Sequence, residues 1–336
     1  MKTSVRTGQP LVVVITGASA GVGRATALEF AKRGARIGLL ARGQEGLDAT
    51  VRDVELAGGE GYALSVDMAD DRAVEQAAAQ IEMTLGDIDI WINNAMVTIF
   101  SPFKQITPDE FRRVTDVTYL GFVHGTRAAL KRMLPRDHGV IVQVSSALAY
   151  RSIPLQSAYC GAKHAVTGFT DSLRSELMHD NSRVRITAVQ LPAMNTPQFG
   201  WARSRMANLP QPVPPIFQPE VAARAIVWAT EHKRREVPVG APTLLAEWVQ
   251  KIAPGLADRY LGATGYGSQQ IEGEPDSGDR PDNLFDPVAG DPGIHGRFGD
   301  RALDRSKELW AVQHRHWLLG ATLAVGALLW MNRHKS

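Results

Sequence analysis

The chain has 336 residues, with 37 basic and 35 acidic side chains and a net charge of +2. Hydrophobic residues make up 44% of it and charged residues 21%, a globular composition that excludes disordered and collagen-like chains. The charge balance argues against a nucleic-acid-binding protein, and the single cysteine, Cys160, excludes internal disulfides and multi-cysteine zinc sites.

Residues 1–10 are too polar for a signal peptide, so we expect a cytoplasmic protein. After them, short apolar runs predict buried strands, and segments of helical periodicity separate these runs. The predicted strands are 11–16, 36–41, 61–66, 88–93, 140–145 and 184–190, and the predicted helices include 21–33, 70–85, 108–133 and 156–179. This alternation predicts an α/β fold, a doubly wound parallel sheet in three layers, with a ligand crevice at the carboxyl ends of the strands.

A glycine-rich turn, from Thr16 to Gly23, joins the first strand to the first helix. Glycines let the backbone turn sharply, and they let a pyrophosphate approach the amides at the helix N-terminus. Such a turn can also be only a tight connection, but its place after the first strand favours a dinucleotide site. The candidate contacts are Gly17, Ser19, Gly21, Val22 and Gly23.

The ends of the next two strands bear on the choice of cofactor. The second strand ends at Arg42, where an acidic residue would favour NAD and an arginine accommodates a 2′-phosphate. A solvated arginine is the alternative interpretation, but Arg24 offers a second cation nearby, so NADP(H) is favoured over NAD(H). Asp67, after the third strand, is a candidate for the adenine edge or a helix N-cap.

Three polar side chains are predicted to meet in the crevice. Tyr159 and Lys163 are four residues apart on one helix and therefore share a face, and the preceding strand ends near Ser146. A phenol is a poor base near neutrality unless a cation stabilises its phenolate, and Lys163 would supply that charge.

With the glycine turn, Asn93-Asn94-Ala95, Ser146 and Tyr159-x-x-x-Lys163, the sequence resembles the classical short-chain dehydrogenases/reductases over about residues 11–240. The resemblance implies that Tyr159 is the general acid/base, that Ser146 orients the substrate carbonyl, and that Lys163 binds the nicotinamide ribose. It also implies cofactor contacts from Asn93, Ala95 and Thr196, a Rossmann-type domain, and a homodimer or homotetramer.

The sequence departs from the family pattern at several positions. Met96 replaces a glycine and adds bulk near the cofactor. Thr118 stands where the family has an asparagine that supports a water-mediated proton relay, so the relay is expected to depend on a threonine hydroxyl. Ala193 replaces another glycine, and Thr196 lies one residue closer to the preceding proline than usual.

The sequence predicts a catalytic domain over 8–262, an acidic Pro/Gly-rich linker over 263–300 and a helical tail over 301–336. Residues 317–331 of the tail are uncharged, and they are predicted to be a short membrane anchor, a helix on another subunit or a helix folded back on the domain. Between Thr196 and Pro219 lies the substrate segment, where the resembling family places the part of the chain that covers its substrate. It offers six apolar residues that line a pocket or close the core: Phe199, Trp201, Met206, Leu209, Ile216 and Phe217.

The sequence therefore predicts an NADP(H)-dependent oxidoreductase that acts on a carbonyl or secondary alcohol of a hydrophobic small molecule. Tyr159, Ser146, Lys163 and Thr118 are the catalytic candidates, and no metal or nucleic-acid partner is expected. The alternative is a cofactor-binding regulatory or scaffold protein with weakened catalysis, tethered by its tail. The expected location is the cytoplasm, or a membrane surface if residues 317–331 act as an anchor.

Overall fold

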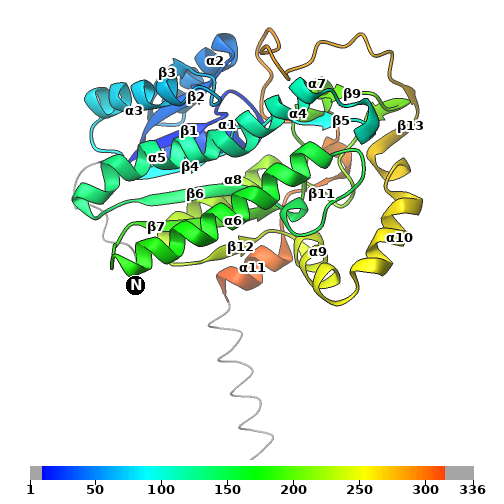
Figure 1. The fold of residues 1–336 in the computed structure, drawn as a ribbon. Coiled ribbons are helices and arrows are strands. Elements are labelled where there is room, and N and C mark those ends of the chain that lie inside the picture. The colour runs from blue at the N-terminus through cyan, green and yellow to red at the C-terminus, as the bar shows by residue number, and fades with distance from the viewer. Residues whose placement is uncertain (1–9, 315–336) are drawn as a thin grey trace, which may run out of the picture.

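A seven-stranded parallel sheet forms the centre of the protein, whose computed structural model describes residues 10–314 (Figure 1). The strand order is β12-β7-β6-β4-β1-β2-β3. The bounds are β1 Val12–Thr16, β2 Arg36–Ala41, β3 Glu60–Ser65, β4 Ile90–Asn93, β6 Val140–Ser146, β7 Arg185–Leu191 and β12 Glu236–Pro238. All six predicted strands are present, and β12 adds a seventh strand of only three residues.

Helices cover both faces of this sheet because its strands are apolar on both sides. Val13 and Ile15 of β1 belong to a core cluster with one set of helices, and Val12 and Val14 belong to a second cluster on the opposite face. The first cluster includes α1 Gly21–Ala31, α2 Gln44–Leu56 and α8 Pro219–Glu231; the second includes α3 Asp71–Leu85, α5 Gly121–Met133 and α6 Ser157–His179. The predicted three-layer α/β class is confirmed.

The strand order reverses next to β1, which lies between β2 and β4. In an open parallel sheet, the crevice for a ligand lies at such a switch point, outside the carboxyl ends of the strands. Here β1 ends at the glycine turn, β4 ends at Asn93, and β6 ends at Ser146. The sheet thus brings the predicted site residues to one edge.

The predicted helix over 108–133 contains a short π-helical segment in its middle. A capping box between Thr107 and Glu110 starts α4, Pro108–Thr115. Residues Asp116–Leu120 then form a π-helix that runs into α5. Such π-segments interrupt the regular helix and often mark functional positions, and Thr118 lies inside this one.

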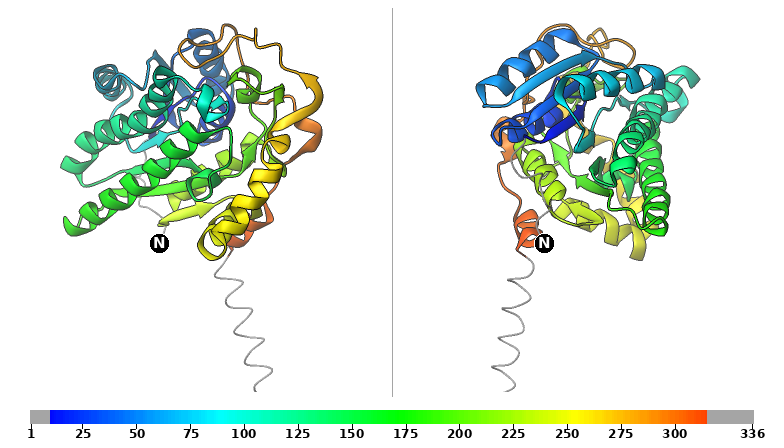
Figure 2. Two further views of the ribbon diagram at one scale, coloured as in Figure 1. Left: turned by 45° about the vertical axis from the view of Figure 1, so that its right-hand side comes forward. Right: turned by 90° about the vertical axis from the view of Figure 1, so that its left-hand side faces the viewer.

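Smaller elements build a second layer beyond the carboxyl edge of the sheet, on the right of Figure 1 and of the left-hand view of Figure 2. Two-residue to six-residue strands form three small sheets: β5 with β9, β10 with β13, and β14-β11-β8. Their bounds are β5 Ile99–Phe100, β8 Ala193–Met194, β9 Arg203–Ser204, β10 Asn208–Pro210, β11 Ile216–Phe217, β13 Gln270–Pro275 and β14 Ala302–Leu303. The helices are α7 Gln198–Trp201, α9 Ala241–Ile252, α10 Pro254–Thr264 and α11 Lys307–Gln313.

Residues 263–300, predicted as a linker, pack against the domain. Strand β13 pairs antiparallel with β10, and the segment after β13 then arches over the top of the molecule toward α2 (Figure 1). Charged side chains and backbone groups of this segment form ion pairs and hydrogen bonds with the domain. The composition of the segment did not predict these contacts.

The apolar residues 317–331 lie outside the described residues. Within residues 10–314, no helix combines the length and apolar composition needed to cross a membrane.

Candidate active site

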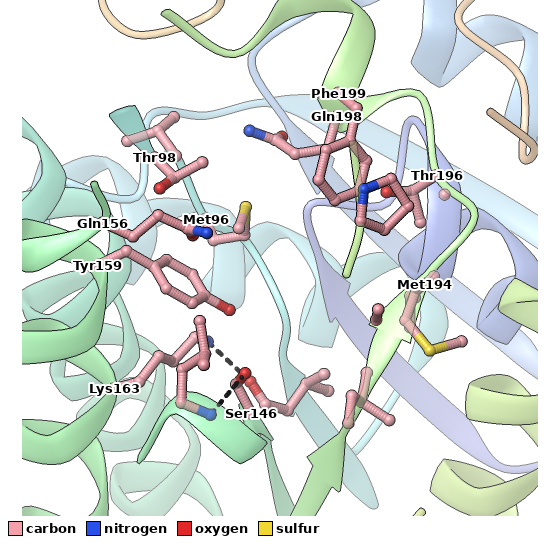
Figure 3. A pocket seen from close by; sticks show the side chains of 18 of the residues that line it. Met96, Thr98, Ser146, Gln156, Tyr159, Lys163, Met194, Thr196, Gln198 and Phe199 are labelled. Carbon is pink, nitrogen blue, oxygen red and sulfur yellow. Dashed lines mark hydrogen bonds between the residues drawn. The ribbon is translucent and has the colours of Figure 1, made fainter. Parts of the chain in front are cut away.

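A cavity of about 750 Å³ lies at the carboxyl edge of the sheet. One part is lined by the glycine turn, Arg42 and Asp67, and another part by Ser146, Tyr159 and Lys163. In Figure 3, Tyr159 points from α6 into the cavity above Ser146 and Lys163, and Thr196 and Phe199 form the opposite wall. This volume falls within the range of small-molecule sites.

The glycine turn is packed so closely that two of its glycines leave no room for a side chain. Gly17 has a φ of +66°, and a Cβ there would lie 2.8 Å from the Cα of Ala95. A Cβ on Gly23 would lie 2.1 Å from the Gly17 carbonyl oxygen. The Thr16 hydroxyl accepts hydrogen bonds from the amides of Asn94 and Ala95, which ties the ends of β1 and β4 together. The turn therefore presents bare backbone to the cavity.

The two arginines near the turn have different partners. Arg24 is buried and pairs with two carboxylates, Asp53 at 2.7 Å and Asp291. Arg42 instead donates to the backbone carbonyls of Asn283, Leu284 and Phe285. Within residues 10–314, no carboxylate lies within ion-pair distance of Arg42, although the charges of Asp67 and Asp286 are near enough to favour its protonated form.

Asp67 lines the cavity with its carboxylate already engaged. Arg113 donates to it at 2.6 Å, and the amide of Ala69 donates at 3.0 Å. Burial alone would raise the pKa of Asp67, but the hydrogen bonds from Arg113 and Ala69, together with the charges of Arg113 and Arg42, outweigh it, and the pKa lies below its usual value. Asp70, and not Asp67, caps α3.

Asn93 lies beneath the cavity, in a fully buried polar network. Its side-chain oxygen accepts from the Trp91 indole, and its amide donates to Thr126 and Gln143 at 3.0 and 2.9 Å. The side chain does not line the cavity, whereas the next residue, Asn94, does. Asn93 thus supports the end of β4 from below.

Ser146, Tyr159 and Lys163 meet as the sequence predicts. The Ser146 hydroxyl accepts from the amide of Leu148 at 3.1 Å, and the Tyr159 hydroxyl points toward it in Figure 3. Burial raises the pKa of Tyr159, and the nearby Ser146 hydroxyl offsets part of that rise. The Lys163 ammonium lies 5.6 Å from the centroid of the Tyr159 ring.

Lys163 is almost completely buried. Its nitrogen donates to the Val144 carbonyl at 2.9 Å and lies 4.4 Å from the centroid of the Phe122 ring. Desolvation lowers its pKa to about 7. A buried amine that titrates near neutrality, beside a phenol in a cavity, is typical of a catalytic site.

The hydroxyl of Thr118 forms two hydrogen bonds with the backbone of Val97. It donates to the Val97 carbonyl at 2.8 Å and accepts from the Val97 amide at 3.1 Å. Thr118 is fully buried and does not line the cavity. Met96, by contrast, lines the cavity near Gln156 (Figure 3), where a side chain adds bulk.

The substrate side of the cavity is largely apolar. Of the six residues proposed from the substrate segment, Phe199 and Trp201 line the cavity, whereas Ile216 and Phe217 are buried in β11. Other apolar lining residues come from the loop between β6 and α6, from the substrate segment itself, and from α9 and α10, which no sequence pattern connected to the site. They include Leu148, Ile153, Val213, Leu245, Val249, Leu256 and Tyr260.

A third group of lining residues comes from the acidic segment after β13. Asn283, Pro287, Val288, Gly290 and Pro292 face the part of the cavity that holds the glycine turn and Arg42. No motif marked these residues. Only the acidic composition, which complements the arginines at the crevice, could have suggested that the segment returns to the domain.

Comparison with known proteins finds relatives of this chain both in sequence and in structure. A sequence profile described as "short chain dehydrogenase" matches residues 11–206. "Uncharacterized oxidoreductase YxnA" from Bacillus subtilis is 30% identical over 95% of this chain and 89% of its own length. A short-chain dehydrogenase from Mycobacterium paratuberculosis bound to NAD is 26% identical, with a TM-score of 0.60 over 68% of this chain and 95% of that one.

A metagenomic short-chain oxidoreductase in complex with NADP is also 26% identical, with a TM-score of 0.58 over 68% of this chain and 95% of that one. These relatives include complexes with either nicotinamide dinucleotide, and they share the parallel sheet described above. The chain therefore belongs to the short-chain dehydrogenase/reductase family.

Proposed function

We propose that the protein is an NADP(H)-dependent oxidoreductase that interconverts a carbonyl and a secondary or primary alcohol on a hydrophobic small molecule. The observation that carries this proposal is the arrangement of one cavity. Tyr159, Ser146 and Lys163 line one part of it, and the bare glycine turn and Arg42 line another. Proton-transfer groups thus share an enclosed space with a backbone suited to phosphates.

The residues present fit a nicotinamide dinucleotide. Backbone at Gly17, Ser19 and Val22 would hold the pyrophosphate, because these residues line the cavity where a Cβ on the neighbouring glycines would clash. Asp67 and Ala95 would contact the adenosine half, and Thr196 the nicotinamide end. When bound, the cofactor supplies or accepts the hydride.

Tyr159 handles the proton in this proposal. Its hydroxyl would donate a proton to the substrate oxygen during reduction and take one from the alcohol during oxidation. Ser146, which lines the cavity beside Tyr159, would donate to the same substrate oxygen and orient it. A positive charge on Lys163, 5.6 Å from the ring centroid, favours the phenolate and so offsets the effect of burial.

Arg42 supports the preference for NADP(H). Among the described residues its guanidinium donates hydrogen bonds only to carbonyl oxygens, so it remains able to form a direct ion pair with a 2′-phosphate. Arg24, already paired with Asp53 and Asp291, is less suited to this role. We expect Arg42→Ala to weaken NADPH binding at least tenfold while changing NADH binding less than threefold.

The substrate is proposed to be apolar because the cavity leads to an apolar mouth on α9 and α10. Leu245, Leu256 and Tyr260 line the cavity and are also 63%, 66% and 67% exposed.

We also propose that residues 317–331 attach the protein to a membrane, and that the chain forms a homodimer or homotetramer. Vesicle flotation of chains with and without residues 315–336, and light scattering, test these two points.

A titration with NADPH and NADH, followed by nicotinamide fluorescence, tests the proposed function. Tight NADPH binding and weaker NADH binding are expected, and oxidation of NADPH should then be observed with an aliphatic probe such as decanal. If neither dinucleotide binds at millimolar concentration, the proposal is wrong.

A further inference from the structure

The acidic segment lies across the proposed dinucleotide site, and we name residues 283–296 the strap. The matched family profile ends at residue 206, so the strap lies beyond the part of the chain that defines the family. In Figure 1 it is the orange segment that arches over the top of the molecule between β13 and the C-terminal strand β14. Its residues form the outer wall of the cavity opposite the glycine turn.

The strap is anchored at both ends to the substrate segment. At its start, the amide of Asn283 donates to the Trp201 carbonyl at 3.0 Å, and Asp282 pairs with Arg203 at 2.8 Å. At its end, the amide of Gly296 donates to the Asn195 carbonyl at 3.1 Å. A Cβ on Gly296 would lie 2.4 Å from the Thr196 carbonyl oxygen, so only glycine fits this approach.

Between the anchors, the strap contacts the groups that would bind the dinucleotide. The Gly293 carbonyl accepts from the amide of Gly21 at 3.1 Å, and Asp291 pairs with Arg24. Pro292 is packed against α2, since a Cβ on Gly46 would lie 3.0 Å from its Cδ. Leu284 is completely buried in an apolar cluster with Val97 and its neighbours.

The strap also orients Arg42. Three carbonyls, of Asn283, Leu284 and Phe285, accept from its two terminal nitrogens. Because a guanidinium has five N–H donors, these contacts fix its plane and leave donors for a further acceptor. Arg113 donates to the Leu284 carbonyl at 2.9 Å and reinforces this arrangement.

We propose that the strap forms the outer wall of the dinucleotide site and positions Arg42 for a 2′-phosphate. The strap must therefore detach before the dinucleotide can leave. This inference rests on the proposed function, because it assigns the strap a role at that site. It follows from the geometry, since the cavity lies between the strap and the glycine turn. A dinucleotide held there is enclosed on both sides.

Two variants loosen the strap at points that do not line the cavity. Asp291→Ala removes the ion pair with Arg24, and Leu284→Ala removes the buried anchor. The matched control is Asp279→Ala, which removes an exposed carboxylate of the same acidic segment with no ion pair in the described part of the chain. Each protein is loaded with NADPH, and release is followed by stopped-flow fluorescence after addition of excess NADP⁺.

We expect the release rate to rise at least threefold in Asp291→Ala and at least tenfold in Leu284→Ala, and to change less than twofold in the control. The ratio of NADPH to NADH affinity should fall in both strap variants, because Arg42 loses its orientation. A merely structural role would lower the thermal midpoint without changing this ratio. Should Leu284→Ala fail to fold, Asp291→Ala decides the question.

The outcome separates this inference from the proposed function. If the wild-type protein binds NADPH but both the release rate and the NADPH/NADH ratio stay within twofold in the folded variants, the strap proposal is wrong and the proposed function stands. If the wild-type protein binds neither dinucleotide, both are wrong. As a second readout, NADPH should slow trypsin cleavage after the exposed Arg297, and equal cleavage with and without NADPH would count against closure.

Discussion

Replacing Thr118 by valine removes the hydroxyl that holds the chain at Val97 and keeps the shape of the side chain. In the wild-type protein this hydroxyl satisfies both the amide and the carbonyl of Val97, at 3.1 and 2.8 Å. Both residues are almost completely buried, so water cannot take over these bonds. A buried polar group without a partner costs about 1–3 kcal/mol, so two of them cost about 2–4 kcal/mol, allowing for partial relaxation.

The loss is measured by urea unfolding, followed by tryptophan fluorescence. Thr118→Ser is the control, because it keeps the hydroxyl and should lose less than about 1.5 kcal/mol. Decanal turnover should change less than threefold in Thr118→Val, since Thr118 does not line the cavity. Unchanged stability together with a tenfold fall in kcat, restored by serine, would refute this reasoning and favour the proton relay that the family resemblance implies.

Three further predictions follow from single contacts. Gly23→Ala should weaken NADPH binding at least tenfold in a fluorescence titration, because its Cβ would lie 2.1 Å from the Gly17 carbonyl oxygen; Gly161→Ala, with open space around it, should not. Unfolding of the wild-type protein and of Lys163→Met should differ in pH dependence. The folded pKa of Lys163 is about 7 against an ordinary 10.5, so the unfolded state binds more protons between these values, and wild-type stability should rise with pH across that window. Parallel profiles would contradict this. Leu256→Ser should raise the KM for decanal more than the KM for butanal, because Leu256 lies at the apolar mouth; equal changes would argue against it.

The central sheet could be predicted from the sequence because its strands are apolar throughout. The run Val12–Ile15, apolar at every position, requires burial on both faces, and the clusters on the two sides of β1 show that burial. The meeting of Ser146, Tyr159 and Lys163 was also predictable. It depends on one strand end and one helical turn, which are local features.

The strap could not be predicted, because its contacts join residues far apart in the chain. Arg42 was recognised as a cation at a strand end, but its carbonyl partners lie more than 240 residues later. Carbonyls are common to all residues and leave no mark in the sequence. Asn93 illustrates a related limit: a motif places it at a strand end but cannot say whether its side chain points into the cavity or, as here, into a buried network.

The most direct test of the central claim is hydride transfer itself. The wild-type protein is incubated with decanal and NADPH carrying deuterium at both C4 positions of the nicotinamide, and the decanol formed is examined by mass spectrometry. Tyr159→Phe serves as the comparison, with its NADPH affinity measured by fluorescence. We predict decanol with one deuterium on C1 from the wild-type protein, and at least a thousandfold less from Tyr159→Phe at unchanged NADPH affinity. Equal labelled product from both proteins would contradict the role of Tyr159, and NADPH binding without labelled product from decanal or any other aliphatic carbonyl compound would contradict the proposed activity.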